Sequence, residues 1–360
     1  MAFTLTDLPH LRAQGFDALI DVRSPAEYAE DHVPGAVNMP VLSNEERARV
    51  GTIYVRESPF KARKIGAALV ARNAAAAIEA HLMDRDGGWR PLVYCWRGGQ
   101  RSGSFASILS QIGWRVETLA GGYQSWRRHV VAQLYETRPP FNVIRLDGFT
   151  GTAKTDLLAR AAARGVQVLD LEGLANHRGS VLGDSFGAQP AQKGFESALM
   201  ECLSAFDPAK PLLIEAESSR IGTLRLPPAL WAAMKDSPRI VVQAVPAHRA
   251  RYLAAQYARL AADASALTAR LDHLRPHVGH ATVDGWLALL HDGQIEALAA
   301  ALIADHYDPA YARLRRSDAT PVLARIDAGD LSPTALDAAA TTIAAQCTRP
   351  GAARAGCKTP

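Results

Sequence analysis

PLVYCWRGGQRS, residues 91–102, is the stretch that decides the fold of the N-terminal part of the chain. Its first four residues have the pattern of a short buried strand, and the glycine pair lets the chain curl tightly before a helix at 102–112. Strand patterns also occur at 17–22 and 115–119, and a helical pattern fills 60–82. Because strands alternate with helices, we predict a parallel α/β sheet.

A cysteine ends this strand and opens a loop rich in glycine and arginine. Consecutive backbone N–H groups and the N-terminus of the next helix form an anion-binding site, which lowers the pKa of a thiol. A buried structural cysteine is the alternative, but it would not explain the flanking glycines and arginines. We predict Cys95 as the catalytic nucleophile, with its anionic substrate bound by Trp96, Arg97, Gly98, Gly99, Gln100 and Arg101.

Three separated segments, 21–40, 94–102 and 119–127, resemble the rhodanese domain, a sulfurtransferase fold whose cysteine carries a persulfide. The resemblance covers residues 5–130 and implies that Cys95 carries a chalcogen. It also implies scaffold roles for Asp21, Arg23, Glu27 and His32. Five residues separate Cys95 from the second loop arginine, one more than in ordinary sulfurtransferases. Because this C-x5-R spacing is shared with cysteine phosphatases, phosphate-ester hydrolysis and plain sulfur transfer both remain alternatives.

A second phosphate-binding pattern is VIRLDGFTGTAKT, residues 143–155. A strand runs into a turn with P-loop spacing, G-x-x-x-x-G-K-[ST], except that alanine replaces the second glycine, and a helix follows at 154–164. The lysine would reach the terminal phosphate oxygens, and the threonine could bind Mg²⁺. An ordinary strand–turn–helix connection with an incidental lysine is the alternative. The predicted phosphate-binding residues are Gly148, Gly151, Thr152, Ala153, Lys154 and Thr155.

A second α/β domain is predicted from further strand patterns at 142–147, 166–171, 211–216 and 239–245. From 248 to about 325 the sequence has a helical pattern. We predict a rhodanese-like domain at 1–135, a P-loop domain at 136–248, a helical extension at 249–325 and a partly disordered tail at 326–360. Polar residues after the strands at 166–171 and 211–216 would face the phosphate-binding cleft. The predicted substrate contacts are Asp170, Glu172, His177, Arg178, Glu215 and Glu217.

The composition excludes several classes of protein. Of the 360 residues, 48% are hydrophobic, which excludes disorder of the whole chain. The net charge of +4 gives no sign of a polycationic tail or domain. The four cysteines have neither metal-ligand nor disulfide spacing. With no signal peptide and no apolar run of about 18 residues, we expect a cytoplasmic protein without a membrane partner.

Over residues 5–315 the sequence resembles the family of bacterial tRNA 2-selenouridine synthases. The resemblance rests on the two motifs and on five further segments, 57–70, 169–183, 189–196, 214–222 and 306–311. The resemblance implies replacement of sulfur by selenium at C2 of wobble 2-thiouridine in tRNA. It implies selenophosphate as donor and an S-geranyl intermediate made from geranyl diphosphate. An enzyme that produces selenophosphate could be a partner. No tightly bound cofactor is expected, and Mg²⁺ could bind at Thr155.

The same resemblance implies roles for the two motifs. Cys95 would attack selenophosphate or accept its selenium, holding it as a selenopersulfide. Arg97 and Arg101 would bind the phosphate group. Lys154 and Thr155 would hold the diphosphate leaving group of the prenyl donor.

Overall fold

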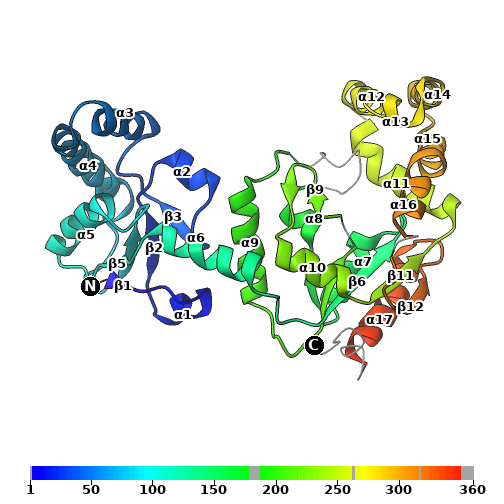
Figure 1. The fold of residues 1–360 in the computed structure, drawn as a ribbon, viewed down its shortest axis with the longest axis horizontal. Coiled ribbons are helices and arrows are strands. Elements are labelled where there is room, and N and C mark those ends of the chain that lie inside the picture. Colours follow the sequence, from blue (N-terminus) through cyan, green and yellow to red (C-terminus); the bar gives the residue numbers. More distant parts are fainter. Residues whose placement is uncertain (1, 178–186, 217, 262–263, 316–317, 350–360) are drawn as a thin grey trace. The chain divides into compact units, whose positions relative to one another are not determined.

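The computed structural model describes residues 2–177, 187–216, 218–261, 264–315 and 318–349, which form two compact units. Unit 1 contains residues 1–137 and 190–205, and unit 2 contains residues 138–189 and 206–360. Figure 1 shows that each unit has its own sheet surrounded by helices. Both sheets are five-stranded and parallel, so the predicted fold class is confirmed.

The sheet of unit 1 has the order β1-β5-β4-β2-β3. Its strands are β1 (Ala2–Phe3), β2 (Ala18–Asp21), β3 (Ala36–Asn38), β4 (Pro91–Tyr94) and β5 (Glu117–Leu119). Its helices are α1 (Leu8–Ala13), α2 (Pro25–Glu30), α3 (Asn44–Arg56), α4 (Pro59–His81), α5 (Gln100–Ile112), α6 (Tyr123–Val131), the π-helix η1 (Ala132–Glu136) and α9 (Gln192–Ser204). The predicted strands at 17–22, 91–95 and 115–119 and helices at 60–82 and 102–112 are therefore confirmed.

The core of unit 1 lies between the sheet and helices α4 and α5. Leu69 and Val70 of α4 and Phe105 of α5 are buried against Val93 in the central strand. Because β4 is buried along its whole length, its side chains are apolar on both faces of the sheet. This packing fixes the end of β4, where Cys95 follows.

Helix α9 belongs to unit 1, although the segments on both sides of it belong to unit 2. Trp126 donates its indole N–H to Ser197 at 3.0 Å, and Arg127 forms an ion pair with the fully buried Glu196. Breaking a buried ion pair typically costs about 3–5 kcal/mol, so these contacts hold α9 on unit 1. The assignment of residues 190–205 to the P-loop domain is therefore corrected.

The parallel sheet of unit 2 has the order β12-β11-β6-β8-β7. Its strands are β6 (Val143–Gly148), β7 (Gln167–Leu169), β8 (Leu212–Glu215), β11 (Arg239–Gln243) and β12 (Val322–Asp327), and β9 (Arg220–Ile221) and β10 (Leu224–Arg225) form a separate hairpin. Helices α7 (Lys154–Ala162), α8 (Leu171–Leu174) and α10 (Pro228–Asp236) connect these strands. The strand patterns of this region and the helix after the phosphate-binding turn are confirmed.

Helices between β11 and β12 form a second core within unit 2, built around Leu271, Trp286 and Leu302. They are α11 (Pro246–Ala261), α12 (Ala264–Asp272), α13 (Arg275–Val278), α14 (His280–His291), α15 (Ile295–Leu302), the π-helix η2 (Ile303–Tyr307) and α16 (Asp308–Arg315). The helical character predicted for this region is confirmed.

The predicted tail is wrong for residues 326–349. Strand β12 adds to the sheet edge beside β11, and helix α17 (Pro333–Thr348) buries Leu336 and Ile343 in the same core as Leu157 of α7. An alanine-rich helix gives a weak sequence signal, and its packing partner lies far away in the chain. The predicted disorder of 350–360 falls outside the described residues. Among the described helices, none is long and apolar enough to cross a membrane.

Candidate functional site

The loop after β4 folds back on the turn between β5 and α6. Gly98 and Gly122 both have positive φ angles, of 68° and 59°. A Cβ atom on Gly122 would lie 2.3 Å from the Cys95 carbonyl oxygen and 2.4 Å from the Gly98 nitrogen. Only glycine therefore allows this approach of the two turns. The Tyr123 amide donates to the same Cys95 carbonyl at 2.8 Å, which anchors the first residue of the loop.

The Cys95 thiol lies at the start of helix α5 and is 4% exposed. The Gly99 amide donates to its sulfur at 3.3 Å, and the Ser102 hydroxyl donates at 3.2 Å. Burial alone would raise the pKa of the Cys95 thiol, but these hydrogen bonds and the charge of Arg101 outweigh it, so the pKa lies below the ordinary thiol value. The structure thus gives Cys95 the surroundings of a nucleophilic thiolate.

The two loop arginines lie in different surroundings. Arg101 pairs with Glu27 at 2.7 Å and is mostly buried, whereas Arg97 is exposed and has no ion pair with any described residue. Burial would raise the pKa of Glu27, but Arg101 and the Ser24 amide lower it below its usual value. Glu27 is therefore a charged group that positions Arg101, a contact that its assignment to the scaffold did not anticipate.

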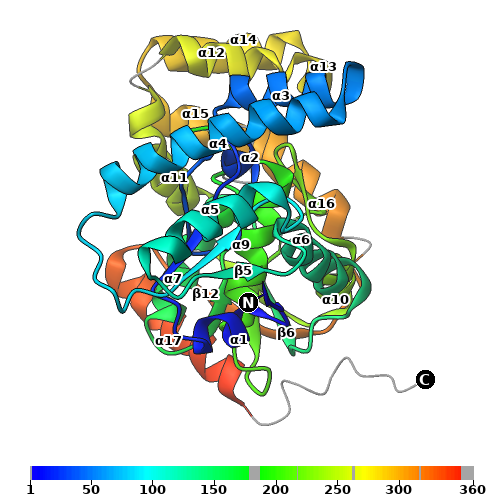
Figure 2. The ribbon, with the colours of Figure 1, turned by 90° about the vertical axis from the view of Figure 1, so that its left-hand side faces the viewer.

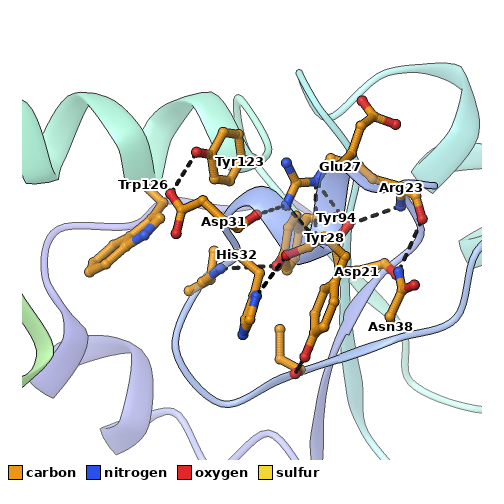
Figure 3. Close-up of polar contacts among 12 residues, drawn as sticks. Asp21, Arg23, Glu27, Tyr28, Asp31, His32, Asn38, Tyr94, Tyr123 and Trp126 are labelled. Carbon is orange, nitrogen blue, oxygen red and sulfur yellow. Dashed lines mark hydrogen bonds and ion pairs between the residues drawn. The ribbon is translucent and has the colours of Figure 1, made fainter. Parts of the chain in front are cut away.

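The scaffold residues form a network of polar contacts that includes Tyr123, as Figure 3 shows. Arg23 and Asp21 form a buried ion pair at 2.6 Å, and the Arg23 guanidinium lies 3.9 Å from the centre of the Tyr123 ring. The Tyr123 hydroxyl donates to Asp31 at 2.6 Å. His32 stacks on Tyr28 and contacts the Tyr28 carbonyl. None of these side chains bonds to the Cys95 sulfur; they act on the loop through the Tyr123 backbone.

Ser102 was missing from the predicted site residues, although it bonds directly to the Cys95 sulfur. We expect Ser102→Ala to raise the pKa of Cys95, because the variant lacks one of the hydrogen bonds that oppose the effect of burial on that pKa. Alkylation by iodoacetamide follows the thiolate fraction, so its midpoint should move to higher pH and its rate at neutral pH should fall about three- to tenfold. Ser104→Ala, an exposed position on the same helix, is the control. An unchanged midpoint in Ser102→Ala would contradict this role of Ser102.

The second candidate site is the P-loop between β6 and α7. Ala153, which replaces the second glycine of the motif, adopts the left-handed conformation with φ 58°, as a glycine would there. Gly151 also has a positive φ, of 84°, and a Cβ atom on it would meet Leu253 at 3.0 Å. The Lys154 ammonium donates to the Gly148 carbonyl at 3.0 Å, across the turn. The turn therefore has the backbone shape of a phosphate-binding loop despite the alanine.

Two helices of the second core brace this turn. Arg249 of α11 is 2% exposed, donates to the Thr150 carbonyl at 2.8 Å and pairs with Asp308 of α16 at 2.6 Å. Its guanidinium also lies 5.2 Å from the Phe149 ring centre. Buried and bonded in this way, Arg249 is a structural support of the P-loop.

Three of the other predicted residues gather beside the P-loop. Thr155 donates to the Glu172 carboxylate at 3.4 Å, and the Glu172 amide donates to the buried Glu215 carboxylate at 2.5 Å. These are oxygen donors of the type that Mg²⁺ prefers. No cluster of three acidic, histidine or cysteine ligands occurs among the described residues. A magnesium ion at Thr155 would complete its octahedral shell with water or with oxygens of a bound phosphate.

The remaining predicted contacts are less close to the turn. Asp170 caps helix α8 by accepting from the Gly173 amide at 2.7 Å, a structural role. His177 is buried beside the hairpin turn at Gly222. Arg178 and Glu217 lie outside the described residues.

Family models match both parts of the chain that carry these two loops. A family model described as the tRNA 2-selenouridine synthase AAA domain matches residues 141–340, and a rhodanese-like domain model matches residues 4–129. A tRNA 2-selenouridine synthase of Marinobacter nauticus is 32% identical over 334 residues, covering 81% of this chain and 87% of that protein. The chain belongs to the tRNA 2-selenouridine synthase family.

Other members of the tRNA 2-selenouridine synthase family show the same likeness. The synthase of Pseudomonas syringae pv. tomato is 29% identical over 337 residues, covering 84% of this chain and 90% of that protein. The synthase of Hahella chejuensis is 38% identical over 237 residues, covering 62% of this chain and 59% of that protein. This last match therefore spans less than two thirds of the relative's length.

Proposed function

We propose that the protein replaces sulfur by selenium at C2 of wobble 2-thiouridine in tRNA, with selenophosphate as donor and an S-geranyl intermediate made from geranyl diphosphate. The observation that carries the proposal is the pairing of an activated thiol in an anion-binding loop with a P-loop turn in one chain of this family. Each loop suits one phosphorus-containing substrate. The cysteine loop would take selenophosphate, and the P-loop would take the diphosphate of the prenyl donor.

The oxidation state of selenium in the donor decides whether Cys95 bonds to selenium or to phosphorus. Selenium in selenophosphate is at the oxidation level of selenide, so a selenopersulfide would need a two-electron oxidant. We therefore assign Cys95 an attack on phosphorus. The S–P bond forms, the P–Se bond breaks, and selenide leaves with the electron pair. Water then cleaves the S–P bond, which releases phosphate and restores the thiol. A loop of backbone amides with Arg101 beside the sulfur suits such a tetrahedral anion.

Selenide would then act on the geranylated base. The C2–Se bond forms, the C2–S bond breaks, and geranylthiolate leaves and takes a proton from water. Alkylation makes the sulfur a better leaving group than the sulfur of 2-thiouridine, which explains the need for the prenyl step. No oxidation state changes in this sequence. At the P-loop, Lys154 and the turn amides would hold the diphosphate, with Mg²⁺ at Thr155 supplying further charge neutralisation.

The proposal is tested by mass spectrometry of nucleosides from tRNA incubated with the protein. With geranyl diphosphate alone, we expect S-geranyl-2-thiouridine; with selenophosphate added, we expect 2-selenouridine. Selenouridine formed without the prenyl donor would contradict the intermediate. Absence of both nucleosides, together with hydrolysis of simple phosphate esters or cyanide-dependent sulfur transfer, would favour the phosphatase or sulfurtransferase alternative.

A further inference from the structure

A cavity of about 950 Å³ lies in unit 1 between helices α3 and α4 and the N-terminus of α5. Figure 2 shows α3 and α4 lying side by side along this unit. Gln100 and Arg101, which begin α5 directly after the cysteine loop, also line the cavity. Cavity and loop therefore share a wall, although no side chain of α3 or α4 has a role in the chemistry described so far.

The walls of the cavity are largely apolar and built from small side chains. Val50 and Val70 lie on opposite helices, and Gly51, Gly66 and Ala67 leave space between them. The helix pair also exposes large apolar groups to solvent: Tyr54 is 55% exposed, Val55 82% and Phe60 64%. Exposed aliphatic and aromatic side chains around a cavity are typical of a site for an apolar ligand.

The charged residues of the cavity all carry the same sign. Arg47, Arg56, Arg63 and Arg101 line it, and no acidic residue does. Arg47 and Arg101 both approach Glu27, whereas Arg56 and Arg63 have no ion pair with any described residue. An apolar cavity with an arginine rim suits an amphiphile that joins a hydrocarbon chain to an anion.

We propose that this cavity binds the isoprenoid chain of the S-geranyl nucleotide during selenium transfer, with Arg56 and Arg63 facing phosphates of the tRNA strand that carries it. The inference rests on the proposed function, because that reaction expels a ten-carbon thiol. Ten carbons fit easily into the volume, and the wall shared with the cysteine loop would place the chain beside the selenium donor. The string 57–70, which matched the family without an assigned role, supplies one side of this cavity.

Two tryptophan variants on helix α4 separate this proposal from a general effect. Ala67 lines the cavity and is exposed, while Ala68 is also exposed but does not line it. Each variant is given selenophosphate and a tRNA that carries either a preformed S-geranyl or an S-methyl 2-thiouridine. We expect Ala67→Trp to lower selenation of the geranyl substrate at least tenfold, about the discrimination that an apolar pocket supplies, and to leave the methyl substrate unchanged. Ala68→Trp should behave as the wild type with both.

The outcomes separate failure of the inference from failure of the function. If the wild type selenates the geranyl substrate and Ala67→Trp does so equally well, the cavity proposal is wrong while the function stands. If the wild type selenates neither substrate, the cavity proposal and the proposed function are both wrong. Equal losses of selenation on the geranyl and methyl substrates would also overturn the cavity proposal. A change in the oligomeric state of Ala67→Trp, measured by sedimentation, would overturn it as well, because the cavity would then hold a second copy of the chain.

Discussion

Cys95→Ala is expected to lower selenium incorporation into tRNA by about 10³-fold or more, because loss of a covalent nucleophile leaves only binding and positioning to act. Formation of S-geranyl-2-thiouridine should continue, since the substitution leaves every residue of the P-loop unchanged. Nucleoside mass spectrometry measures both products in one digest. With radiolabelled selenophosphate and a rapid quench, the wild type should carry phosphorus on the protein and the variant should not.

Cys202→Ala is the matched control, since this cysteine lies on α9 and not in the cysteine loop. It should keep wild-type selenation. Full 2-selenouridine formation by Cys95→Ala would show that the thiol is not the nucleophile. Selenium rather than phosphorus on the quenched wild-type protein would favour the selenopersulfide mechanism. It would also show that the reaction needs an oxidant.

Local patterns explain why much of both sites could be predicted from the sequence. A strand that ends in Cys95, two glycines and a helix start are neighbours in the chain, so their geometry follows from residues that are read together. The P-loop is equally local, and Ala153 shows that the backbone shape survives loss of the consensus glycine. In both cases the local backbone geometry follows from neighbouring residues, and in the cysteine loop the Gly99 amide that bonds to Cys95 belongs to the same short segment.

The parts that could not be predicted depend on contacts between distant segments. Helix α9 packs on unit 1 because Glu196 and Ser197 meet partners about 70 residues earlier in the chain. The role of Gly122 arises only where two turns meet, and Arg249 braces the P-loop from 99 residues away. Ser102 had a local signal, its place in the first turn of the helix after the cysteine, and could have been found.

Lys154→Ala is expected to lower kcat/KM for geranyl diphosphate about 10²-fold, because a charge-assisted contact to the terminal phosphate oxygens is lost. The fold should survive, since the Lys154 ammonium bonds to a carbonyl of its own turn, that of Gly148. The rate of S-geranyl-2-thiouridine formation is measured against donor concentration, and tRNA binding is measured separately. We expect tRNA affinity to remain as in the wild type.

Lys210→Ala, which removes an exposed lysine of the same unit, is the control and should leave geranylation unchanged. The sharper comparison gives the Lys154→Ala protein a tRNA that already carries the S-geranyl group. Because Cys95 and the cysteine loop are intact, selenation of this tRNA should proceed at the wild-type rate. A mixture of the Cys95→Ala and Lys154→Ala proteins should then convert 2-thiouridine to 2-selenouridine through a released intermediate. Loss of selenation by Lys154→Ala on the preformed substrate would instead mean that the P-loop serves the selenium step.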